Sequence, residues 1–127
     1  MIITKHIAFF FIEKRIKYIN TIINEANNYK YKTDIYIHTN YKFSKELLVK
    51  YTNGNINIIC YNLQNINPFK LTWLCRYLLK QQINKYDIFM YIEDDILVKA
   101  ETIEYWLKYS NLYSNLYTHG CVVPAVQ

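Results

Sequence analysis

The chain has 127 residues, of which 52% are hydrophobic and 20% charged, with a formal net charge of +5. This length and balance predict a single globular domain over residues 1–127 and exclude a disordered or fibrous protein. Two glycines and two prolines leave no obvious linker and no glycine-rich phosphate loop. The 15 lysines and arginines are scattered along the chain, so nucleic acid is not the expected ligand.

The first half of the chain alternates apolar runs with amphipathic stretches. Lys5 to Ile12 is almost wholly apolar between charged ends, which predicts a buried strand. From Lys14 to Tyr29, isoleucines recur every three or four residues and predict a helix. Alternating residue types in Thr33 to Thr39 predict a second strand, with Ile35 and Ile37 on one face. Ser44 to Lys50 follows as a short amphipathic helix that Ser44 caps.

The second half continues the alternation of strands and helices. Asn53-Gly54 is expected to form a turn before a third strand, Ile56 to Cys60. A longer helix starts at Pro68, where the missing N–H costs nothing. An apolar strand from about Tyr86 leads into a helix at Glu101 to Tyr113, and a last strand is expected near Gly120. This order predicts an α/β protein with a mostly parallel, Rossmann-like sheet and flanking helices.

Three cysteines, Cys60, Cys75 and Cys121, are odd in number and lack CxxC spacing. This pattern predicts reduced, mostly buried thiols in an intracellular protein. The longest early apolar run, Ile7 to Ile12, is too short for a membrane span or a signal peptide. We therefore expect a soluble, cytoplasmic protein without a transmembrane segment.

The strand that begins near Tyr86 ends in three consecutive carboxylates, Glu93, Asp94 and Asp95. Adjacent anions repel one another and favour water or a cation. In parallel α/β sheets, ligands bind beyond the carboxyl ends of the strands, so these acids fall where a site is expected. If the chain stays extended here, Glu93 and Asp95 lie on one side, roughly 7 Å apart, and can serve one ion. Oxygen ligands favour Mg²⁺ or Mn²⁺, although a solvated acidic loop is the alternative.

These residues resemble a known family. Glu93-Asp94-Asp95, followed by Ile96-Leu97-Val98, resembles the DXD-type signature of GT-A glycosyltransferases, which bind a nucleotide-diphospho-sugar through a divalent ion. Asn67 to Arg76 is similar to the Pro-x-x-Leu-Thr-Trp-x-x-Arg helix that precedes the acidic motif in one such group. Residues 15–18 and 33–40 are also similar, so the likeness covers nearly the whole chain. It implies an enzyme that transfers a sugar from this donor to an acceptor hydroxyl.

The resemblance also implies roles for single residues. Asp95 would bind the metal directly, Glu93 would bind the metal or the donor ribose, and Asp94 would lie beside the donor sugar. The remaining residues implied in donor binding are Phe11, Arg15, Thr39, Asn40 and Arg76. Each of these also has a plain structural interpretation, as a core, turn or surface residue.

The chain departs from the family pattern in two ways. Cys75 and Asn67 stand where the family often has histidine. GT-A domains usually continue past the acidic motif with an acceptor-binding half that supplies a general base. This chain ends at Gln127, so the domain is expected to be truncated and no catalytic base can be named. His119 is more simply interpreted as a turn residue.

Two other interpretations stay open. One is Mg²⁺-dependent phosphoryl transfer on nucleic acid in a Toprim-like arrangement, with Glu13 joining the later acids. The other is a non-catalytic, truncated domain that binds a nucleotide or a partner chain. The sequence also leaves open whether a second copy or a partner chain covers the C-terminal edge of the sheet.

Overall fold

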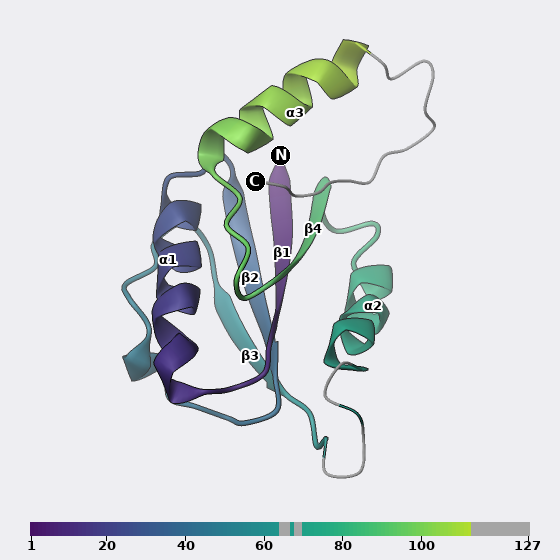
Figure 1. The fold of residues 1–127 in the computed structure, drawn as a ribbon. Coiled ribbons are helices and arrows are strands. Elements are labelled where there is room, and N and C mark those ends of the chain that lie inside the picture. The colour runs from purple at the N-terminus through teal and green to yellow at the C-terminus, as the bar shows by residue number, and fades with distance from the viewer. Residues whose placement is uncertain (64–66, 68–69, 113–127) are drawn as a thin grey trace.

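A computed structural model describes residues 1–63, 67 and 70–112 of the chain. Strands and helices alternate along it, as Figure 1 shows. In chain order the elements are β1 (Ile2–Phe9), the 3-10 helix η1 (Glu13–Arg15), α1 (Ile16–Asn27), β2 (Lys32–Thr39), the 3-10 helix η2 (Lys45–Leu47), β3 (Ile56–Cys60), α2 (Leu71–Gln81), β4 (Ile88–Glu93) and α3 (Ala100–Leu112).

The four strands form one parallel sheet in the order β3-β2-β1-β4. The chain moves outward from β1 through β2 to β3 and then returns to place β4 on the other side of β1. Strand order therefore reverses between β1 and β4, which is where α/β sheets open a crevice at the carboxyl ends of their strands. The predicted α/β class with a parallel sheet and flanking helices is confirmed, and the architecture is compatible with a Rossmann-like fold.

The two faces of the sheet carry different side chains. Odd-numbered residues of β1 and β2 meet α1 in an apolar core, which contains Ile3, Ile7, Phe9, Ile35 and Ile37 from the strands and Ile19, Ile22, Ile23 and Ala26 from the helix. The predicted apolar face of this helix is thus confirmed. The helix α2 covers the other face, where a small buried apolar cluster of the described residues contains Ala8, Leu71 and Cys75. In Figure 1, α3 crosses the end of the sheet at which the chain begins, away from the carboxyl ends of the strands.

Two predicted elements have markedly different bounds in the structure. The first strand is Ile2–Phe9, so the prediction of Lys5 to Ile12 was wrong at both ends. Lys5 is fully buried, and its amine donates a hydrogen bond to the Tyr29 hydroxyl. The predicted helix from Ser44 to Lys50 is only the turn η2, although Ser44 does cap it by accepting a hydrogen bond from the Glu46 N–H at 3.1 Å.

The other predicted elements within the described residues agree in type, and the bounds of α1, β2, β4 and α3 are displaced from the predicted ones by one or two residues. β3 has the predicted bounds, and α2 begins at Leu71, while Pro68 lies outside the described residues. The predicted positions of His119, Gly120 and Cys121 also lie outside them. Of the two described cysteines, Cys75 is buried and Cys60 is exposed, so the prediction of buried thiols was wrong for Cys60. None of the described helices is long and apolar enough to cross a membrane.

Gly54 connects the region after η2 to β3 and is expected to tolerate no side chain. Its φ of +149° is rarely adopted by other residues, and a Cβ here would lie 2.1 Å from the Thr33 carbonyl oxygen. We expect Gly54→Ala to lower the free energy of unfolding by about 3 kcal/mol, through backbone strain and overpacking together. Urea unfolding measures this loss, with Asn24→Ala on the exposed side of α1 as control. Equal stability of the two variants would show that β3 has room to shift.

Candidate functional site

The acidic residues form a turn at the carboxyl end of β4. The strand ends at Glu93, and the Ile96 N–H donates to the Glu93 carbonyl oxygen at 3.1 Å. The chain therefore does not stay extended through the three acids, so the condition under which Glu93 and Asp95 lie on one side is not met, and Val98 follows the turn into the core. Asp94 is only 9% exposed, whereas the side chains of Glu93 and Asp95 face solvent.

Arg15 links this turn to the end of β1. Its Nε donates to Asp94 Oδ2 at 2.7 Å, across 79 positions of sequence. This hydrogen bond raises the pKa of Arg15, and the charges of Asp94 and Asp95 raise it further. The guanidinium carbon also lies 5.1 Å from the ring centre of Tyr18. Arg15 is thus a fixed cation beside both aspartates, at the point where strand order reverses.

The ends of β1 and β2 are joined by a second contact. The Phe11 N–H donates to Asn40 Oδ1 at 2.7 Å, which fixes the chain that leads to Arg15. The Phe11 ring packs against Tyr41 at 4.8 Å and Phe43 at 5.4 Å, measured between ring centres. Thr39 is fully buried, so its side chain supports the end of β2 and does not line the surface.

Arg76 lies on α2, which covers the face of the sheet opposite α1. Its guanidinium carbon lies 4.0 Å from the Trp73 ring centre on α2. Burial raises the pKa of Tyr91 on β4, the charge of Glu93 raises it as well, and the charge of Arg76 lowers it. The charges of Glu93 and Arg76 therefore both act on the Tyr91 hydroxyl, while Asp94 and Arg15 form a pair of their own.

The capacity of the turn to hold a metal rests on two carboxylates. Within residues 1–63, 67 and 70–112, no group of three or more histidine, cysteine, aspartate or glutamate side chains is placed to share one ion. Asp94 is already paired with Arg15, which leaves Glu93 and Asp95 as exposed oxygen donors. Such donors fit a hard divalent ion, provided that water or a phosphorylated ligand completes its coordination.

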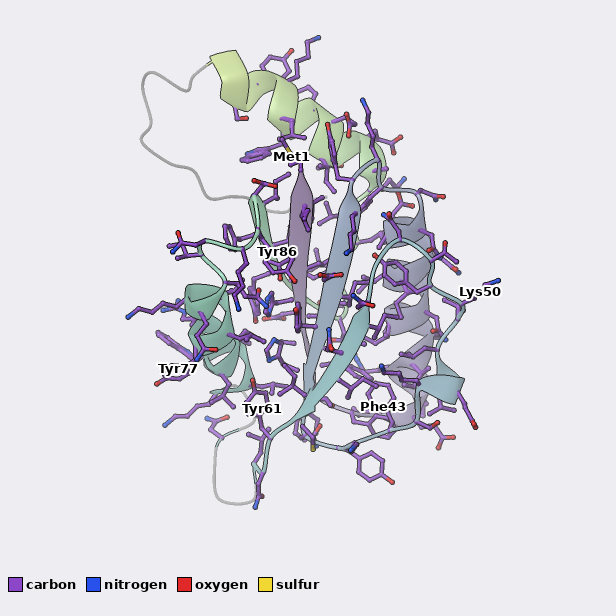
Figure 2. All side chains as sticks on the ribbon, turned by 180° about the vertical axis from the view of Figure 1, so that it is seen from behind. Met1, Phe43, Lys50, Tyr61, Tyr77 and Tyr86 are labelled. Carbon is purple, nitrogen blue, oxygen red and sulfur yellow. The ribbon has the colours of Figure 1, made fainter. Side chains whose placement is uncertain are left out.

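A chain of buried polar side chains under α2 was missed by sequence reasoning. His6 Nδ1 lies 2.7 Å from His38 Nε2, and His38 Nδ1 lies 2.8 Å from the Tyr61 hydroxyl. At the other end, His6 Nε2 lies 2.9 Å from Gln82 Oε1, which also accepts from the Thr4 hydroxyl at 2.6 Å. Both imidazoles are fully buried. Tyr61 lies at the end of the chain of hydrogen bonds, just after β3 (Figure 2).

The hydrogen bonds of this chain run in one direction. Gln82 Oε1 has no hydrogen, so His6 must donate from Nε2 and accept at Nδ1. His38 must then donate from Nε2, and its bare Nδ1 accepts from the Tyr61 hydroxyl. Burial lowers the pKa of His6 to about 4 and that of His38 to about 3, so both rings are neutral at pH 7. We call these five residues, Thr4, His6, His38, Tyr61 and Gln82, the histidine chain.

The sequence did hold a signal for the histidine chain. Side chains that can form hydrogen bonds occupy every second position of two neighbouring strands, at Thr4 and His6 in β1 and at Asp34, Tyr36 and His38 in β2. A period of two places them on one face of the sheet. Nearby, burial raises the pKa of Cys75 to about 12, so this thiol stays protonated at neutral pH.

Two hollows flank β3, at the edge of the sheet far from β4. One, of about 540 Å³, includes Asp34, Tyr51 and Asn57 in its lining, and the other, of about 610 Å³, includes Phe43 and Leu78. Neither is lined by a residue of the acidic turn. The candidate site is therefore defined by Arg15 and the acidic turn, which meet between β1 and β4, because the described residues that line the two hollows include no comparable group of charged side chains.

Comparisons of the chain with protein-family models, with curated proteins and with solved structures gave no match.

Proposed function

We propose that this chain is the donor-binding domain of a metal-dependent glycosyltransferase of the GT-A type. The observation that supports this most is the meeting of Arg15 with the Glu93–Asp95 turn at the reversal of strand order. A crevice in this position is the usual ligand site of an open α/β sheet. The proposed substrate is a nucleotide-diphospho-sugar, and the proposed reaction transfers its sugar to an acceptor hydroxyl.

The residues of the site suit a diphosphate. Glu93 and Asp95 would hold Mg²⁺ or Mn²⁺, which supplies positive charge to stabilise the departing diphosphate. Arg15 adds a permanent cation whose remaining N–H groups can donate to phosphate oxygens. Asp94 keeps the guanidinium in one orientation through its 2.7 Å hydrogen bond. The half-exposed Phe11 and the exposed Tyr41 offer a flat surface to the nucleoside.

Thermal unfolding with a panel of UDP, GDP, CMP and their sugars, with and without Mn²⁺, tests the proposal. We expect the melting temperature to rise only when both the metal and one nucleotide are present. The nucleotide phosphates would complete the coordination of the metal, and the metal would offset the charge of the phosphates. A ligand at a hundredfold excess over its Kd adds about 2.7 kcal/mol. Asp95→Ala is expected to abolish this stabilisation, because it removes one of the two exposed carboxylates of the turn.

Glu46→Ala, which removes an exposed carboxylate from η2, is the matched control and should leave the stabilisation unchanged. Equal stabilisation of both variants would exclude the acidic turn as the metal site. A salt-dependent shift of DNA in a gel, with no effect of nucleotides, would instead support phosphoryl transfer on nucleic acid. Nucleotide binding without sugar transfer or donor hydrolysis would support a non-catalytic domain.

A further inference from the structure

The outer side of α2 presents aromatic and cationic side chains together. Facing away from Leu71 and Cys75, which contact the sheet, it carries a stripe of five residues: Lys70, Trp73, Arg76, Tyr77 and Lys80. We call these residues the α2 stripe. A spacing of three and four residues places them along one side of a helix. In Figure 2, Tyr77 projects from α2 away from the sheet.

The apolar groups here are exposed to an unusual degree for their size. Trp73 is 59% exposed and Tyr77 is 73% exposed, and Ile83, just beyond the helix, is 64% exposed. Single exposed apolar residues are common on protein surfaces, but adjacent exposed aromatic side chains mark a contact surface. The 4.0 Å stack of the Arg76 guanidinium on Trp73 joins the apolar and the charged parts of the stripe.

The charge of this region has one sign. From Lys70 to Tyr86 the sequence contains four cations, Lys70, Arg76, Lys80 and Lys85, and no aspartate or glutamate. The nearest acid that follows, Asp87, already accepts a hydrogen bond from the Ile2 N–H at 2.7 Å. This charge favours an anionic partner, and the exposed Trp73, Tyr77 and Ile83 favour a partner that also accepts apolar side chains.

We propose that the α2 stripe docks on the surface of an anionic lipid bilayer. Tryptophan and tyrosine favour the level of the lipid headgroups, where lysine and arginine beside them meet lipid phosphates. Ile83 favours a bilayer over nucleic acid, since an aliphatic side chain gains burial among acyl chains but stacks poorly on bases. This docking is peripheral and does not depend on the proposed sugar transfer.

Binding to vesicles tests the proposal. We expect the protein to sediment with vesicles of phosphatidylcholine and phosphatidylserine and to bind weakly to phosphatidylcholine alone. The double variant Lys70→Glu, Lys80→Glu is expected to lower the partition constant at least about tenfold, since each cation near an anionic surface contributes to binding. In a Trp106→Phe background, the emission of Trp73 is expected to shift to the blue when anionic vesicles are added.

The matched control carries the same change of charge on another part of the surface. Lys30→Glu, Lys50→Glu reverses two exposed lysines, and Figure 2 shows Lys50 on the flank opposite Tyr77. This control is expected to alter the partition constant less than about twofold, because these lysines stay distant from the headgroups. Equal losses in both double variants, or no binding to anionic vesicles, would overturn the proposal. Binding of a single-stranded oligonucleotide in place of vesicles, lost in the Lys70 and Lys80 variant, would assign the stripe to nucleic acid.

Discussion

Replacing Lys5 with methionine is expected to raise the free energy of unfolding at pH 7 by roughly 3 to 4 kcal/mol. Lys5 lies fully buried on the α1 side of β1 and donates to the Tyr29 hydroxyl. Burial lowers the pKa of its amine from 10.5 to about 7, against the opposing charge of Glu25. Methionine fills a similar volume without a charge, and the Tyr29 hydroxyl keeps its 2.6 Å hydrogen bond to the Val98 carbonyl oxygen.

The dependence on pH distinguishes this cause from better packing. The folded-state pKa of Lys5 is below the unfolded value of 10.5. Between pH 10.5 and about pH 7, the Lys5 amine is therefore protonated in the unfolded chain and neutral in the folded protein. The native protein therefore loses stability as the pH falls from 10.5 to about 7 and loses no more below that. We expect the advantage of Lys5→Met to shrink to less than about 1 kcal/mol at pH 10.

Urea unfolding of both proteins at pH 7 and pH 10 measures this advantage. Lys17→Met, at an exposed position of α1, is the control and should show no such dependence on pH. An advantage of Lys5→Met that is the same at both pH values would mean that packing, and not the buried amine, limits stability.

Acid is expected to unfold the protein through the histidine chain. The folded-state pKa values of His6 and His38, about 4 and about 3, lie below the ordinary 6.5 because both rings are buried. Their contribution to stability is complete above pH 6.5 and is lost as the pH falls through 6.5 toward these values. Between pH 6.5 and pH 5 each histidine is expected to cost about 2 kcal/mol of the free energy of unfolding.

Two measurements check this expectation. The free energy of unfolding, followed in urea, should fall between pH 6 and pH 5 with a slope that approaches two protons taken up on unfolding, at pH values below those in which Lys5 titrates. Nitrogen NMR should find both rings neutral, with the hydrogen on Nε2, down to pH 5. If either ring gains a proton near pH 6.5 in the folded protein, the described chain of hydrogen bonds does not form in solution.

Much of the fold follows from local patterns in the sequence. The isoleucines of α1 and the alternation in β2 depend on neighbours a few residues apart, so both elements were predicted closely. The bounds of β1 were not, because Lys5 and His6 look like surface residues. Their partners, Tyr29 and Gln82, lie 24 and 76 positions away in the sequence, and no local sequence pattern predicts contacts over such separations.

The candidate site was predictable in position but not in arrangement. Three acids after an apolar strand indicate the rim of a sheet, and β4 does end there. The division of roles among the acids depends on Arg15, which is 79 positions from Asp94 and draws only that carboxylate inward. The turn of the backbone after Glu93 also depends on packing of Val98 in the core, which the acidic residues themselves do not reveal.

The single direction of the histidine chain restricts how this protein can change over evolutionary time. Thr4, His6, His38 and Tyr61 each donate one hydrogen to the next group, so exchanging a donor for an acceptor at either buried histidine leaves two lone pairs facing each other. A lineage that replaces His38 must therefore also replace His6 or Tyr61, or else fill the space with apolar groups throughout. We expect substitutions at the five positions of the histidine chain to occur together in related sequences. In the apolar core under α1, single hydrophobic substitutions are expected to be tolerated.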